Sequence, residues 1–89
     1  MDTIKFTIII PVKDRCEYLY HTLRTCLMQD YKDLTIIVAD DASSDDTVSM
    51  VENMSKKDSR LKLIARKERV GMRANFEDAL NRVKEGYVI

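Results

Sequence analysis

The sequence predicts an α/β protein with a mainly parallel sheet, and three observations support this fold class. Short apolar runs rich in β-branched residues alternate with segments whose apolar residues recur at helical spacing. The apolar runs are continuous, as expected for strands that are buried on both faces of a parallel sheet. Polar and helix-capping residues follow the runs directly. Strands that alternate with helices in this way form βαβ units with right-handed crossovers.

The first strand and helix occupy the first third of the chain. Residues 6–10 form an apolar, β-rich run that Pro11 closes. A helix is predicted from residue 17 to about residue 29, because its apolar residues fall on one face. These residues are Cys16, Leu19, Leu23, Cys26 and Leu27.

A second strand and helix follow in the same pattern. Residues 34–39 predict a buried strand that ends at Asp40 and Asp41. Residues 42–47 are rich in N-cap types and lead into a helix that ends in the polar stretch 55–60. The apolar stripe of this helix consists of Val48, Val51 and Met54.

The last third of the chain predicts two more strands and one more helix. Residues 61–65 form the third strand, a helix begins after Gly71 with Gly86 as its stop, and residues 87–89 begin a fourth strand. The helix carries Met72, Phe76, Leu80 and Val83 at helical spacing, and Met72 and Phe76 are predicted to be core. Because the chain ends inside an apolar strand, we expect residues 1–89 to be the N-terminal part of one longer domain.

Composition limits the classes of partner. Fifteen basic and fifteen acidic residues give a formal charge of zero, so no global field attracts nucleic acid or an anionic membrane. The apolar run at residues 6–12 is too short to span a membrane, and the N-terminus does not resemble a signal peptide. A reducing cytoplasm is therefore the expected compartment. Cys16, Cys26 and His21 lack the spacing of a metal site.

The predicted ligand site lies beyond the carboxyl ends of the strands, where open α/β sheets bind ligands. Three loops qualify: residues 11–15, 40–46 and 66–75. The glycine motifs of dinucleotide-binding and phosphate-binding loops are absent from this chain. A receiver domain would carry its acidic pair after the first strand, whereas Asp40 and Asp41 follow the second.

Strand alternation allows at most one of Asp40 and Asp41 to face a ligand. The alternative is that both carboxylates only start the turn and the following helix. Asp45 and Asp46 are predicted to stabilise the start of that helix through its dipole. The basic cluster at residues 66–69 either contacts phosphates or is a solvated loop.

At these positions the sequence resembles the N-terminal part of family 2 glycosyltransferases, which have the Rossmann-like GT-A fold, a three-layer sandwich. The family pattern is an apolar strand followed by P-x-Y-N, a helix ending near N-Q-x-Y, and a second strand ending in D-D-x-S-x-D-x-T. The matching segments here are PVKD at residues 11–14, MQDY at 28–31 and DDASSDDT at 40–47. The resemblance covers residues 6–89 and implies a βαβαβαβ portion of that fold.

The resemblance implies a nucleotide-sugar site in this chain. Asp41 corresponds to the aspartate that hydrogen-bonds the pyrimidine N3–H, and Arg73 lies in a region near the donor diphosphate. Two positions depart from the family: Lys13 stands where an aromatic residue often stacks on the base, and Ala42 stands where glycine is usual. The full set of implied nucleotide-sugar contacts is Pro11, Val12, Lys13, Asp14, Asp40, Asp41 and Arg73.

The resemblance also implies what would follow this chain. Family members carry a D-x-D motif after the fourth strand that binds Mg²⁺ or Mn²⁺, and a later carboxylate serves as general base in an inverting transfer. The resemblance therefore predicts no catalytic residue and no metal ligand within residues 1–89. The expected donor is a UDP- or dTDP-sugar and the acceptor a glycan or lipid-linked hydroxyl, in cell-surface polysaccharide or glycolipid synthesis at the cytoplasmic face of the membrane.

Two other hypotheses stay open at this point. One is a non-catalytic nucleotide-binding α/β module that uses Asp41 and the first loop. The other is a receiver-like regulatory or scaffold domain, which would bind no uridine nucleotide.

Overall fold

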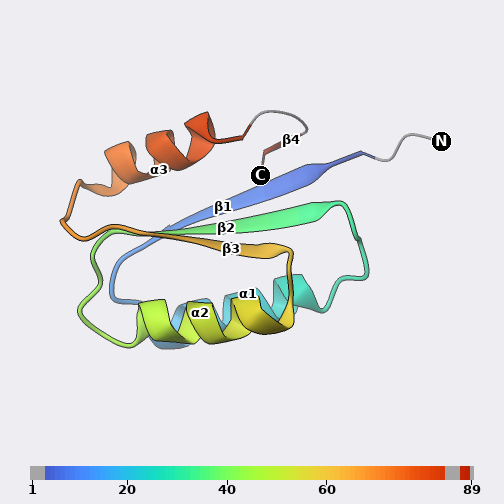
Figure 1. Ribbon diagram of the computed structural model, residues 1–89, viewed down its shortest axis with the longest axis horizontal. Helices are drawn as coiled ribbons and strands as arrows, with labels where there is room; N and C mark the ends of the chain where they lie inside the picture. The colour runs from blue at the N-terminus through green and yellow to red at the C-terminus, as the bar shows by residue number, and fades with distance from the viewer. Residues whose placement is uncertain (1–3, 84–86, 89) are drawn as a thin grey trace.

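The computed structural model describes residues 4–83 and 87–88 and has the predicted α/β fold. Three helices cover the two faces of a parallel sheet with strand order β3-β2-β1-β4 (Figure 1). Helices α1 and α2 lie on one face and α3 on the other, so the molecule has three layers (Figure 1). The elements are β1 (Phe6–Val12), α1 (Cys16–Leu27), β2 (Leu34–Asp40), α2 (Thr47–Lys57), β3 (Leu61–Ala65), α3 (Met72–Asn81) and β4 (Tyr87–Val88).

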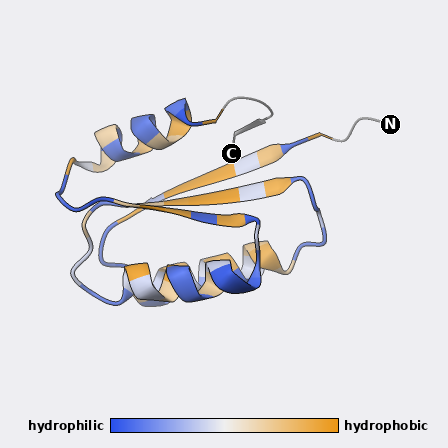
Figure 2. Ribbon diagram, viewed as in Figure 1, coloured by the Kyte–Doolittle hydropathy of each residue, from blue (hydrophilic) through white to orange (hydrophobic). Residues whose placement is uncertain are grey.

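Two apolar clusters fill the spaces between the layers, because successive strand side chains point to opposite faces. The larger cluster joins β1, β2 and β3 to α1 and α2, and the smaller joins β1 and β2 to α3. In Figure 2 the strands are largely apolar, while the helices alternate apolar and polar residues. The buried members of the larger cluster are Val12, Leu19, Leu23, Leu34, Ile36, Val38, Val51 and Leu61, and those of the smaller are Ile9, Ala39 and Ala79.

The first strand is longer than predicted, because Pro11 lies inside it. Strand β1 continues to Val12, and Pro11 pairs with Ala39 in the parallel register. Phe6 donates its amide to the carbonyl of Asp33, and Val12 accepts from the amide of Asp41, so alternate residues of β1 face β2. The nitrogen of Pro11, which carries no hydrogen, therefore faces away from β2. It lies on the side of β4, whose described residues pair with Phe6 and Thr7. The prediction that Pro11 ends the strand was wrong for this reason.

The predicted core of α3 needs correction. Met72 is 46% exposed and Leu80 is 38% exposed, while Asn75 and Ala79 are fully buried. The helix therefore packs through the small side chain of Ala79 and the hydrogen-bonded side chain of Asn75. Phe76 and Val83 are partly buried beside them. The helix ends at Asn81 within the described residues, and the predicted stop at Gly86 lies outside them, as does Ile89.

Arg60, which sequence reasoning did not single out, closes the C-terminal end of α1. Its guanidinium donates to the carbonyls of Leu27 (2.8 Å), Gln29 (2.7 Å) and Tyr31 (2.9 Å). Asp58 holds the same guanidinium at 2.8 Å, and its hydrogen bonds from Arg60 lower the pKa of the Asp58 carboxyl. A cation at a helix C-terminus satisfies carbonyls that lack intrahelical partners and complements the helix dipole.

We expect Arg60→Ala to destabilise the protein by about 2 kcal/mol, because several charge-assisted hydrogen bonds are lost at once. Urea denaturation monitored by circular dichroism measures the change. The matched control is Lys56→Ala, which removes an exposed cation from the last turn of α2 and should change stability by less than about 0.5 kcal/mol. Equal stability of the Arg60→Ala protein and the wild type would contradict the assigned role.

Candidate functional site

A cavity of about 670 Å³ opens at the carboxyl end of β1, on the edge where the loops after β1, β2 and β3 gather (Figure 1). Four of the seven predicted site residues line it: Pro11, Val12, Lys13 and Asp14. The other described residues around it come from the end of β1, the first turn of α1 and the loop before α3, and they are Ile10, Arg15, Tyr18, Leu19, Arg69 and Met72. The volume is that of a small-molecule site.

Two aspartates join the first two loops through reciprocal hydrogen bonds. The carboxylate of Asp14, just before α1, accepts the amide of Ser44 (2.7 Å) and that of Asp45 (3.3 Å) before α2. Asp45 in return accepts the amide of Cys16 at 3.3 Å, and the amide of Thr47 at 2.9 Å. The backbone bond from Ser44 lowers the pKa of Asp14, and the Thr47 hydroxyl bond lowers that of Asp45. The two loops are therefore fixed to one another.

Lys13 is held within the same network. Its ammonium donates to the carbonyl of Ala42 at 3.1 Å and lies 3.3 Å from the Asp14 carboxylate. The amide of Asp14 donates to the Ser43 hydroxyl at 2.8 Å. Lys13 and Asp14 thus line the cavity while they also join the loop after β1 to the loop after β2.

Asp40 and Asp41 bind to different loops, as strand alternation predicts. Asp40 is fully buried and accepts the Ser43 amide at 3.0 Å together with the Ser43 hydroxyl. This contact makes Asp40 a turn residue of its own loop.

Asp41 anchors the loop that leads into α3. Its carboxylate is fully buried and accepts the amides of Val70 (2.7 Å) and Gly71 (2.9 Å). Arg69 adds a guanidinium 3.9 Å from the same carboxylate. Two amide hydrogen bonds and a nearby cation offset the cost of burying this charge. Neither aspartate is among the described residues that line the cavity.

Asn75 and Arg66 hold the start of α3 against the end of β2. The buried amide of Asn75 donates to the carbonyl of Ala39 at 2.7 Å, and its oxygen accepts from Arg66 at 2.7 Å. Arg66 also lies 2.7 Å from Asp78, which lowers the pKa of that carboxyl. The basic cluster that includes Arg66 was a possible phosphate contact in the sequence, whereas in the structure Arg66 and Asn75 position the helix. The signal for this role in the sequence was Asn75, a polar residue on the helical face that packs against the sheet.

Arg73 lies apart from the cavity. Its side chain is 92% exposed and pairs with Glu77 one turn along α3, at 3.0 Å. Arg69 is the arginine of this loop that lines the cavity. The structure thus brings together Pro11, Val12, Lys13 and Asp14, adds Arg69, Tyr18 and Met72, and leaves Arg73 outside.

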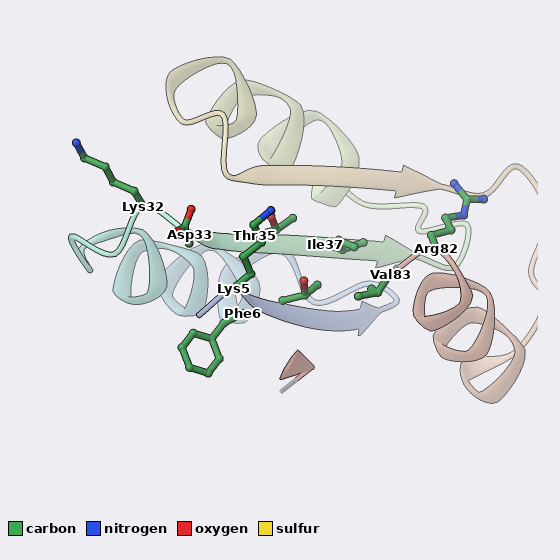
Figure 3. Close-up of a pocket in the computed structure, with 9 residues that line it drawn as sticks. Lys5, Phe6, Lys32, Asp33, Thr35, Ile37, Arg82 and Val83 are labelled. Atoms are coloured by element: carbon green, nitrogen blue, oxygen red, sulfur yellow. The ribbon is translucent and has the colours of Figure 1, made fainter. Parts of the chain in front are cut away.

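A second cavity, of about 390 Å³, lies at the opposite end of β1 and β2 (Figure 3). Among its charged side chains, Lys32 extends away from the sheet and Arg82 lies at the far end of the group (Figure 3). The cavity at the carboxyl ends of the strands is therefore the better candidate for a ligand site.

Within residues 4–83 and 87–88, no three His, Cys, Asp or Glu side chains are grouped as metal ligands would be. The residues present thus do not form the Mg²⁺ or Mn²⁺ site that the family resemblance implies. Cys16 and Cys26 are half-buried free thiols, and burial raises the pKa of Cys16. None of the helices in the described part of the chain is long and apolar enough to cross a membrane.

Comparison with known proteins identifies the family. Residues 7–89 match glycosyl transferase family 2, which is nearly the whole chain. The chain belongs to this family. Of the segments that carried the resemblance, PVKD lines the cavity, and DDASSDDT runs from the end of β2 to the start of α2.

Named glycosyltransferases are among the relatives. A GalNAc(5)-diNAcBac-PP-undecaprenol beta-1,3-glucosyltransferase of Campylobacter jejuni is 47% identical over 58 residues, which are 65% of this chain and 19% of that protein. Glycosyltransferase GlyA of Streptococcus pneumoniae is 32% identical over 84 residues, which are 94% of this chain and 12% of that protein. The chain thus spans a fifth or less of the length of these two relatives.

A solved structure supports the fold assignment. The mannosyltransferase PcManGT from Pyrobaculum calidifontis, in complex with GDP-Man and Mn²⁺, superposes with a TM-score of 0.81 at 26% identity, over 94% of this chain and 26% of that protein. The GT-A fold and the family 2 resemblance predicted from the sequence are therefore confirmed.

Ala42 keeps a positive φ although it is not glycine. Its φ is 61°, in the left-handed region where the Cβ atom of an L-residue is crowded. The carbonyl of Ala42 accepts from Lys13, so the turn retains this conformation within the network that joins the two loops. The family's glycine would adopt it without the steric cost.

We expect Ala42→Gly to stabilise the protein by about 0.5–1 kcal/mol, because it relieves this crowding by more than the added chain entropy costs. Thermal and urea denaturation measure the change. The matched control is Ala74→Gly in the exposed face of α3, which should destabilise by about 1 kcal/mol. Loss of stability in both variants would show that the Ala42 turn is not strained.

Proposed function

We propose that this chain is the donor-binding, N-terminal part of an inverting glycosyltransferase that uses a UDP- or dTDP-sugar. The observation that carries the proposal is the cavity at the strand ends, which is lined by Pro11, Val12, Lys13 and Asp14, the first segment of the family pattern. The presence of a nucleotide sugar in the related PcManGT complex supports it. Because that complex holds GDP-Man, GDP belongs among the ligands to be tested.

The cavity is lined by both apolar and charged side chains. Pro11 and Val12 come from β1, and Lys13 and Arg69 bring cations to the edge. A nucleoside diphosphate needs both features, since its base is planar and largely apolar on its faces and its phosphates are anionic.

Asp41 contributes to donor binding through the loop it holds. Both of its oxygens accept amides of Val70 and Gly71, and its side chain is fully buried. The predicted contact with a base N–H therefore requires the segment at Val70 and Gly71 to move aside. In the structure as it stands, Asp41 places Arg69 at the cavity.

The remaining parts of the proposal concern the longer protein. Mg²⁺ or Mn²⁺ would neutralise the diphosphate through an acidic motif after β4. A lipid-linked acceptor and a place at the cytoplasmic face of the membrane are proposed from the C. jejuni relative, whose name includes undecaprenol. The alternative, a non-catalytic nucleotide-binding module, is disfavoured because the matched proteins are glycosyltransferases several times longer.

We expect the coding sequence past Ile89 to continue in frame and to encode an acidic D-x-D motif within about ten residues, as the family resemblance implies. Sequencing the transcript and its genomic locus checks this. A stop codon directly after Ile89 would support the non-catalytic module instead, which would bind nucleotide without a metal ion.

We expect Asp41→Ala in the full-length protein to weaken UDP binding by on the order of 1.5–3 kcal/mol, because a charged hydrogen-bonding group that organises the site is lost. Isothermal titration with UDP, dTDP and GDP measures it. Asp46→Ala is the matched control, since Asp46 is an exposed carboxylate whose side chain makes no capping bond to α2. UDP affinity that is unchanged in a folded Asp41→Ala protein would refute the role of Asp41.

A further inference from the structure

Tyr18 stands out among the side chains around the cavity. It lies in the first turn of α1, directly before the buried Leu19, and its own side chain is 74% exposed. Tyr20, two residues along the same helix, is 38% exposed and lines a separate groove between α1 and α2. The ring of Tyr18 is therefore an apolar surface that the core does not use and that borders the candidate site.

Two further exposed side chains of the cavity come from the segment around the start of α3. Arg69 is 67% exposed and is anchored near Asp41 at 3.9 Å. Met72, the first residue of α3, is 46% exposed. A phenol ring, a planar guanidinium and a thioether thus border one cavity that Pro11 and Val12 also line.

These groups favour a flat aromatic ligand. Tyrosine rings and arginine guanidinium planes both stack on nucleobases, and such stacking tolerates different bases because every base has a π-face. A thioether contacts aromatic groups favourably as well. By contrast, the buried carboxylates of Asp40 and Asp41 offer no exposed surface to a base in this structure.

We propose that Tyr18 is a ligand-contacting residue that stacks on the base of the donor nucleotide. This inference rests on the proposed function and adds to it a contact that the sequence pattern did not indicate. Arg69 and Met72, which line the same cavity, would also border the base.

The test uses the full-length protein, with UDP, dTDP and GDP as probes in isothermal titration. We expect Tyr18→Ala to weaken binding of the preferred nucleotide by about tenfold, the effect of losing one base–aromatic stack. Tyr18→Phe keeps the ring and should bind within about twofold of the wild type. Tyr20→Ala is the matched control and should also stay within about twofold.

The outcomes separate this inference from the proposed function. If wild-type protein binds a nucleotide and Tyr18→Ala binds it equally well, the stacking role is refuted while the proposed function stands. If Tyr18→Phe binds as weakly as Tyr18→Ala, the hydroxyl rather than the ring makes the contact, and stacking is again refuted. If the wild type binds none of the three nucleotides, the proposed donor site fails and the Tyr18 role fails with it.

Discussion

The parallel pairing of β1 with β2 is the constraint on which the site depends. Seven residue pairs run in register from Phe6 and Leu34 to Val12 and Asp40, so both strands end at the same level. The loops that follow then lie side by side, and the amide of Asp41 still bonds to the carbonyl of Val12. A slip of one residue would turn every apolar side chain to the wrong face, so the two buried clusters fix the register. This alignment brings Asp14 and Asp45 close enough to bond to one another's loops.

The end of β2 then connects the two halves of the structure. Asp40 folds its own loop through Ser43, and Asp41 reaches the loop before α3. Adjacent strand residues point to opposite faces, so one dipeptide serves both layers of helices. Asn75 adds a bond from α3 to the carbonyl of Ala39, one residue before the pair. The acidic pair therefore organises the cavity edge through backbone groups.

Much of this architecture could be predicted from the sequence, because continuous apolar runs and helical periodicity are local signals. The third strand matched its predicted limits, and the opposite directions of Asp40 and Asp41 followed from alternation. The errors arose where tertiary contacts determine strand limits and burial. Pro11 stays in its strand because its nitrogen faces away from β2. On α3, Asn75 rather than Met72 takes the buried position. The roles of Arg60 and Asn75 depend on carbonyls 29 to 36 residues away, which no local pattern reveals.

The structure changes which groups can meet a ligand. Buried polar groups in a folded protein are satisfied, and the most conspicuous polar residues of this sequence follow that rule: the oxygens of Asp40, Asp41 and Asn75 are all bonded within the chain. Breaking the two amide bonds of Asp41 to admit a base would cost part of the binding energy gained. Side chains that are already exposed at the cavity carry no such cost. Recognition by Tyr18 and Arg69, on a frame held by Asp41, is therefore the arrangement that physical chemistry favours here.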